Sequence, residues 1–149
     1  KNATVINNMG VVALFGDDVT GAKEMFSAAS GAGKEVNYNK GIIAIKQADY
    51  SGAVSKFGSD NTFNSALAKL LNGDNDGALK AIDASEAKET AKGYYLKAII
   101  GARTANKDLM NNNMKSAVAK DASLKTKAMN DAEFLKYRAD AAFIALFAK

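Results

Sequence analysis

Three asparagines stand at equivalent places along this sequence: Asn8, Asn39 and Asn64. A side-chain amide donates and accepts hydrogen bonds at once, so a column of such groups suits the backbone of an extended peptide. The step from Asn8 to Asn39 equals the step from Gly10 to Gly41, and the step on to Asn64 is somewhat shorter. A period of roughly 20–50 residues indicates stacked helical hairpins, none of which can bury its apolar face alone.

The composition removes most of the usual catalytic groups. The 149 residues include no cysteine and no histidine, so the chain has no thiol nucleophile and no imidazole base. Carboxylates such as Asp17, Asp18, Glu86 and Glu89 could transfer protons, but the sequence pairs them with no nucleophile or metal. Helix surfaces carry such groups routinely. We therefore expect a protein that is not an enzyme and needs no cofactor.

Two short segments resemble ligand loops but depart from them. Residues 72–77, with Asp83 closing the span, approximate a calcium loop, yet asparagine stands at the first ligand and aspartate at the last. The repeat also requires helix from about residue 75, which would pull these oxygens apart. Residues 31–34 match a phosphate loop only in part, since Ala28 replaces its first glycine and Glu35 its hydroxyl residue. No metal or phosphate site is predicted.

Charge and hydropathy narrow the class of partner. The net charge is +4, from 20 basic and 16 acidic residues that are interspersed along the chain. Nucleic-acid binders usually concentrate their basic residues in a stripe, so we expect no nucleic acid. No apolar run reaches the roughly 18 residues of a membrane span, so we expect no membrane insertion by this segment. The chain begins at Lys1 rather than methionine, and we interpret it as part of a longer protein.

Apolar residues recur at separations of three and four, as in Val5, Met9 and Val12, which predicts helices rather than strands. A single helical domain of four hairpins follows: 2–15 with 19–30, 35–47 with 50–57, 61–71 with 75–83, and 88–104 with 107–120. The hairpins span residues 2–30, 35–58, 61–84 and 88–120, and two or three short helices over 121–149 are expected to close the stack. Aspartate or asparagine is expected to cap the second helix of each hairpin, at Asp18, Asp49, Asp74 and Asn106.

The repeated positions resemble those of the tetratricopeptide repeat, a helix–turn–helix unit of about 34 residues. The first copy is filled by Asn8, Gly10, Asp18, Ala22 and Phe26, and the second by Asn39, Gly41, Asp49, Tyr50, Ala53 and Phe57. The third has Asn64, Ala66, Asp74 and Ala78, while the fourth is degenerate. Segments 131–134 and 140–143 are similar to the Asp-Pro-x-Phe ends of many bacterial repeats, with alanine in place of proline. The resemblance implies an all-α, right-handed superhelix of antiparallel hairpins with short capping helices.

The same resemblance implies a binding site for a protein or peptide. In peptide-binding members of the family, the asparagine lies on the concave face and hydrogen-bonds the peptide backbone. The implied groove residues are Asn8, Asn39, Asn64, Tyr38, Phe63, Tyr94, Tyr95 and Lys46. One alternative is that asparagine is merely the commonest residue at this position. Another is that apolar neighbours such as Ile42 and Leu67 are buried between adjacent helices.

Several functional roles stay open on the sequence alone. We expect a non-enzymatic scaffold that binds a protein or peptide partner; the sequence does not predict the oligomeric state. The alternatives are a structural spacer in a larger assembly and a helper domain fused to an enzyme encoded elsewhere in the gene. Similar alanine- and lysine-rich repeats occur in bacterial envelope proteins, which favours the periplasmic side of the envelope over the cytoplasm.

Overall fold

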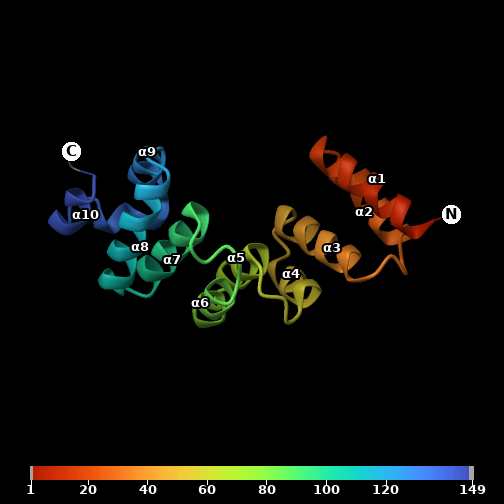
Figure 1. Cartoon of the computed structure of the whole chain (residues 1–149), viewed down its shortest axis with the longest axis horizontal. Helices are drawn as coiled ribbons and strands as arrows, with labels where there is room; N and C mark the ends of the chain where they lie inside the picture. The colour runs from red at the N-terminus through yellow and green to blue at the C-terminus, as the bar shows by residue number, and fades with distance from the viewer. Residues whose placement is uncertain (1, 148–149) are drawn as a thin grey trace. The chain divides into compact units, whose positions relative to one another are not determined.

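The computed structural model describes residues 2–147, and every regular element in that range is helical (Figure 1). This confirms the predicted all-α class. The elements are α1 (Ala3–Phe15), α2 (Val19–Ala28), α3 (Lys34–Lys46), α4 (Tyr50–Phe57), α5 (Phe63–Leu71), α6 (Asn75–Asp83), α7 (Ala91–Arg103), α8 (Lys107–Lys120), α9 (Leu124–Asn130), the 3-10 helix η1 (Ala132–Tyr137) and α10 (Ala141–Ala145).

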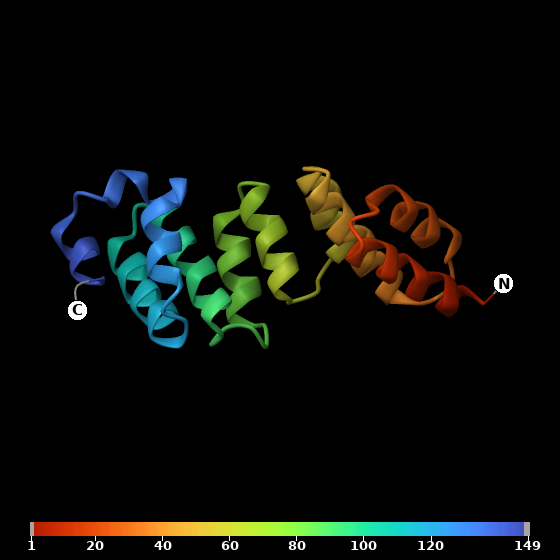
Figure 2. The ribbon, with the colours of Figure 1, turned by 90° about the horizontal axis from the view of Figure 1, so that it is seen from above.

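Consecutive helices pack in pairs: α1 with α2, α3 with α4, α5 with α6, and α7 with α8. Figure 2 shows α5 and α6 side by side. The contacts divide the chain into two compact units, Lys1–Asp60 and Asn61–Lys149, called unit 1 and unit 2 below. Unit 1 holds the first two hairpins, and unit 2 holds the other two and the short C-terminal helices.

Each hairpin turn ends in a side-chain cap, as the sequence predicts. The carboxylates of Asp18, Asp49 and Asp74 each accept a hydrogen bond from the backbone amide three residues on, at 2.8–2.9 Å. Asn106 does the same for Leu109 at 3.0 Å. These bonds satisfy one of the free amides of the first helical turn. They fix where α2, α4, α6 and α8 begin.

The residue before each cap has a left-handed backbone. Its φ is 58° at Asp17, 58° at Ala48, 86° at Gly73 and 56° at Ala105. Only one of these four residues is glycine, the type that adopts this conformation without steric cost. The four turns therefore share one backbone shape although their sequences differ.

Within unit 1, the two helices of each hairpin pack through a glycine on the first helix and a phenylalanine on the second. A Cβ atom added to Gly10 would lie 2.6 Å from the ring of Phe26, and one added to Gly41 would lie 2.7 Å from the ring of Phe57. Both rings are buried. The absence of a side chain on the first helix thus allows the aromatic ring of the second helix to reach it. The two hairpins are copies of one packing unit, since the glycine and the phenylalanine keep the same separation in both.

The C-terminal helices close unit 2 around aromatic side chains. Phe134 is fully buried, with its ring centroid 5.7 Å from that of Tyr95 and 5.6 Å from that of Phe143. Asp131 and Asp140 cap η1 and α10 through bonds of 3.1 and 2.9 Å to backbone amides. Each Asp-Ala-x-Phe segment thus combines a cap with a buried ring. The predicted closing helices are confirmed through residue 147, and the rest of the predicted segment lies outside the described residues.

Over residues 2–147, no helix is both long enough and apolar enough to cross a bilayer.

Candidate functional site

Unit 2 contains an apolar groove between α5, α7 and α9, with a volume of about 540 Å³. Its apolar lining comes from Phe63, Leu67, Tyr95, Leu96, Ile99 and Leu124. We call this the unit 2 groove. Phe63 and Tyr95 belong to the residues predicted from the sequence, and the structure brings both to the same groove although they stand on different hairpins.

Two lysines flank the aromatic residues of this groove. The ammonium of Lys92 lies 4.9 Å from the ring centroid of Phe63, and that of Lys127 lies 4.8 Å from the centroid of Tyr95. Both are within the range of a cation–π interaction. Neither lysine forms an ion pair with a described residue. The groove therefore has an apolar wall beside two ammonium groups that form no ion pair with residues 2–147.

Tyr95 is held in place by a hydrogen bond. Its hydroxyl donates to Oδ2 of Asp131 at 2.8 Å, and the residue is only 5% exposed. Burial, and then the neighbouring Asp131 carboxylate, raise the pKa of Tyr95 far above its ordinary value of 10.0. The hydrogen bond and the burial fix the phenol ring as one wall of the groove.

The two aspartates that line the groove are engaged by their own chain. Asp131 accepts from Tyr95 with one oxygen and from the Glu133 amide with the other. Oδ1 of Asp121 accepts from both the hydroxyl and the backbone amide of Ser123, and these bonds lower the pKa of Asp121. The oxygens that accept these hydrogen bonds stabilise the local fold. The ammonium groups of the two lysines can therefore pair with a carboxylate of a partner. The arrangement can bind an apolar group with a nearby anion.

The predicted asparagines of unit 1 are arranged differently from a regular column. Asn39 donates from Nδ2 to Oδ1 of Asn7 at 3.0 Å, and Asn8 is exposed. Tyr38 places its ring edge-on to Phe57, with centroids 5.3 Å apart. Asn7, Tyr38 and Asn39 line a shallow pocket of about 370 Å³. In the first hairpin it is therefore Asn7 that meets Asn39.

The other predicted residues lie outside both pockets. Lys46 forms an ion pair with Asp17 at 3.3 Å. Tyr94 is half-buried, with the ammonium of Lys97 4.9 Å from its ring centroid. Asn64 is half-buried on α5. Neither Tyr94 nor Asn64 is among the residues that line the unit 2 groove.

The residues of the groove that the sequence does not predict include both lysines, Lys92 and Lys127, and Leu124. Lys92 stands three residues before Tyr95 on α7, so helical spacing could have placed it beside the predicted tyrosine. Lys127 and Leu124 come from α9, in the segment that was predicted only to close the stack. No local pattern indicates that this helix returns to line the same groove as α7.

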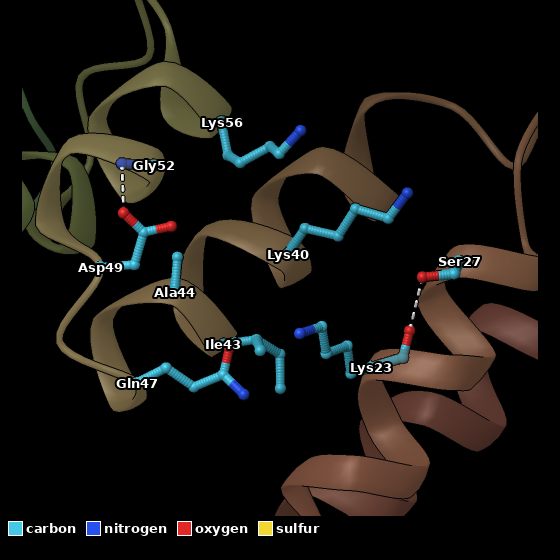
Figure 3. Close-up of a pocket in the computed structure, with 9 residues that line it drawn as sticks. All are labelled: Lys23, Ser27, Lys40, Ile43, Ala44, Gln47, Asp49, Gly52 and Lys56. Carbon is cyan, nitrogen blue, oxygen red and sulfur yellow. Dashed lines mark hydrogen bonds between the residues drawn. The ribbon is translucent and has the colours of Figure 1, made fainter.

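Unit 1 contains another pocket, of about 300 Å³, between α2, α3 and α4 (Figure 3). Lys23, Lys40 and Lys56 line it, and none of them forms an ion pair with a described residue. The Asp49 carboxylate caps Gly52 here, as the dashed line in Figure 3 shows. The pocket suits an anion but offers no aromatic surface. The unit 2 groove is the better candidate for a protein partner because it can bury apolar side chains.

Residues 2–147 contain no group of three or more histidines, cysteines, aspartates or glutamates that could hold a metal ion. In the segment that approximates a calcium loop, Asp74 caps α6 and the helix begins at Asn75. Comparisons of the chain with protein-family models, curated proteins and solved structures found no match.

Proposed function

We propose that this chain is a non-enzymatic interaction domain that binds a segment of a partner protein in the unit 2 groove. The observation that carries the proposal is an aromatic and aliphatic groove flanked by two lysines without carboxylate partners among the described residues. The occupant that fits is an apolar side chain with an acidic residue beside it in the partner sequence. Buried aromatic anchors of this kind dominate the energetics of many protein interfaces.

The wider architecture belongs to the same proposal. We propose that the hairpins form a right-handed tetratricopeptide-like superhelix, with Asn8, Asn39 and Asn64 on its concave face. The paired helices, the capped turns and the matching Gly10–Phe26 and Gly41–Phe57 contacts support it. We also place the protein on the periplasmic side of a bacterial envelope, on the strength of its alanine- and lysine-rich repeats. A structural spacer is the main alternative, and a domain that supports a fused enzyme is the second.

A peptide-display selection against the whole chain tests the groove. We expect selected peptides to combine a large apolar residue with aspartate or glutamate. Phe63→Ala should weaken their binding about tenfold or more, since truncated aromatic anchors typically cost over ~1 kcal/mol. Leu135→Lys is the control, because Leu135 is 62% exposed in unit 2 and does not line the groove. Equal binding by wild type and Phe63→Ala would contradict the proposal.

The asparagines require a separate test. Asn39→Ala should weaken a partner that lies along unit 1 by about 1 kcal/mol, as expected for one lost hydrogen bond. Because Asn39 also bonds to Asn7, the thermal midpoint of each variant is measured first. A spacer without a partner would show equal binding profiles for wild type and for the combined Asn8, Asn39 and Asn64 alanine variant.

A further inference from the structure

Three lysines from three different helices meet at one pocket of unit 1. Lys23 comes from α2, Lys40 from α3 and Lys56 from α4, and all three line the pocket of about 300 Å³ that Figure 3 shows. We call this the lysine pocket. In that view the side chains of Lys40 and Lys56 extend toward the side where α2 lies, and the side chain of Lys23 extends from α2 toward Ile43. Three positive charges thus border one cavity.

The repeated hairpin does not require a charge at any of these three positions. We align the first three hairpins on their buried alanines, Ala22, Ala53 and Ala78. The equivalent residues in the other two hairpins are Val54 and Leu79 for Lys23, Met9 and Ser65 for Lys40, and Met25 and Ala81 for Lys56. All six are uncharged. The lysines are therefore particular to this pocket and are not part of the repeat pattern.

The three lysines also lack the neighbours that usually balance a charge on a helix surface. Opposite charges on a helix attract at separations of three and four residues. None of the three has an aspartate or glutamate at those separations on its own helix. None forms an ion pair with a residue between 2 and 147. Glu24 stands next to Lys23 in the sequence but lines a different groove, formed by α1 and α2.

One carboxylate, that of Asp49, lines the lysine pocket. Its Oδ1 accepts a hydrogen bond from the Gly52 amide at 2.9 Å and so caps α4. Three lysines and one aspartate give the lining a net charge of +2. Unit 1 as a whole has six basic and six acidic residues and is neutral. Half of the basic residues of a neutral unit therefore lie at this one cavity.

The rest of the lining suits a small oxyanion. Ile43 and Ala44 contribute apolar surface and are only 3% and 8% exposed, and a nearby apolar surface strengthens the attraction between charges. The side-chain amide of Gln47 can donate to an anion, and it bonds to no residue between 2 and 147. With two aliphatic side chains and no aromatic ring, the pocket offers little to an apolar ligand.

We propose that the lysine pocket binds the phosphate group of a small soluble molecule. A phosphate monoester carries a charge of about −1.5 to −2 at pH 7, which matches the net charge of the lining, whereas a single carboxylate carries half as much. Lysine binds phosphate as a compact charge with three donors, so ammonium groups from three helices can each bind a different oxygen. The volume is at the lower end of the range for small-molecule pockets, about 300–1,000 Å³, which favours a phosphate on a short carrier. This proposal is independent of the unit 2 groove.

A titration of the whole chain with inorganic phosphate, followed by amide chemical shifts at constant ionic strength, tests the site. We expect saturable shifts at the residues that line the lysine pocket, with a dissociation constant on the order of 1 mM. Lys40→Gln should weaken binding about tenfold, as expected for a lost hydrogen bond to a charged group. Lys34→Gln is the matched control, because Lys34 is an exposed lysine of unit 1 that forms no ion pair with residues 2–147 and does not line this pocket. Both variants should keep the helical circular dichroism of the wild type.

Further arms separate a specific site from general attraction of anions. Phe63→Ala, in the unit 2 groove, should leave phosphate binding unchanged. Sodium chloride should cause no saturable shift at the same residues. The proposal is overturned if phosphate causes no saturable shift, or if Lys40→Gln and Lys34→Gln weaken its binding equally. Vesicles of phosphatidylcholine with phosphatidic acid present the same group on a surface and should not bind the chain. Vesicle binding that Lys40→Gln abolishes also overturns the proposal, because the pocket then recognises a membrane surface.

Discussion

The two units of the chain contain the same kind of hairpin but differ in how completely their surfaces are covered. Unit 2 ends in three short elements that bury Phe134 and Phe143, and its helices are joined by bonds between distant residues. Tyr137, for example, donates to the Ala102 carbonyl at 2.9 Å. Unit 1 has a smaller core and leaves the outer face of α1 open. A repeated hairpin is thus stabilised by what lies next to it as much as by its own sequence.

The units differ in charge as well. Unit 1 has six basic and six acidic residues, whereas unit 2 has 14 basic and 10 acidic ones. The whole net charge of +4 therefore belongs to unit 2, which also holds the groove with its two lysines. Unit 1 thus combines a net charge of zero with an exposed apolar helix face, whereas unit 2 carries the positive charge.

The largest effect is expected from the aromatic cluster of unit 2. Phe134→Ala should lower the free energy of unfolding by about 3–5 kcal/mol, because it empties a fully buried site between two rings. Hydrogen exchange should show the loss in α7–α10 and leave α1–α4 protected. Leu135→Ala, at the exposed neighbouring position, should change stability by no more than about 0.5 kcal/mol. Equal loss of protection in both units would mean that they unfold together.

A smaller effect, confined to unit 1, is expected from overpacking a hairpin. Ala53 is fully buried where α4 meets α3, so Ala53→Leu should destabilise the fold by about 1–3 kcal/mol. Ser51→Leu adds the same side chain to an exposed site on the same helix and serves as the control. Urea unfolding followed by circular dichroism measures both. A neutral Ala53→Leu would show that α3 and α4 can separate without cost.

The hydrogen bonds that join α5, α7 and η1 should contribute less to the free energy of unfolding than the packing at Ala53. Arg103 donates to Oε2 of Glu133 at 2.9 Å and to the Leu70 carbonyl at 2.8 Å, and it is about one-third exposed. Arg103→Met should cost about 1 kcal/mol, since partly exposed ion pairs are weak and the Leu70 carbonyl keeps its hydrogen bond from the Gly73 amide. Lys115→Met, at an exposed lysine without an ion pair to any described residue, should be neutral in the same urea titration.

The smallest effect concerns pH. The Lys107 ammonium, aided by the Ala142 amide, lowers the pKa of Asp140 below its ordinary value of 3.8. The carboxylate therefore stabilises unit 2 above that pH, and this contribution is lost as the pH falls through the lower value in the folded chain. Lys107 in turn has its pKa raised above 10.5 by Asp140, so the pair is also lost at strongly alkaline pH. Asp140→Asn should make acid unfolding of unit 2 less steep and leave unit 1 unchanged.

Helix boundaries could be read from the sequence where a side-chain cap stands at a turn. The helices α4, α6 and α8 begin and end at the predicted residues. By contrast, α5 and α7 begin two and three residues later than predicted, because Thr62 and Thr90 cap them. Threonine before a helical segment is a usable signal of a helix start, and it would have corrected both boundaries. The helix α2 ends at Ala28, two residues before the predicted end.

The candidate site was harder to predict than the helices. Phe63 and Tyr95 could be assigned to one inner face from the repeat, but Leu124 and Lys127 depend on the path of the chain after α8. The contact between Asn7 and Asn39 depends on the rotation of α1, which a one-residue shift changes by about 100°. Because asparagine stands at both positions 7 and 8, the sequence alone does not show which of the two contacts Asn39.

The left-handed turn positions also show how the sequence of such a repeat can diverge in evolution. Three of the four left-handed turn positions are filled by Asp17, Ala48 and Ala105, each at a cost of roughly 1–2 kcal/mol relative to glycine. The capping bond and the paired helices hold the turn in shape in spite of this cost. Aspartate, alanine and glycine therefore occupy this position in different hairpins with the same left-handed backbone. Descendants of one ancestral hairpin would therefore keep superposable backbones after their turn sequences had diverged beyond recognition.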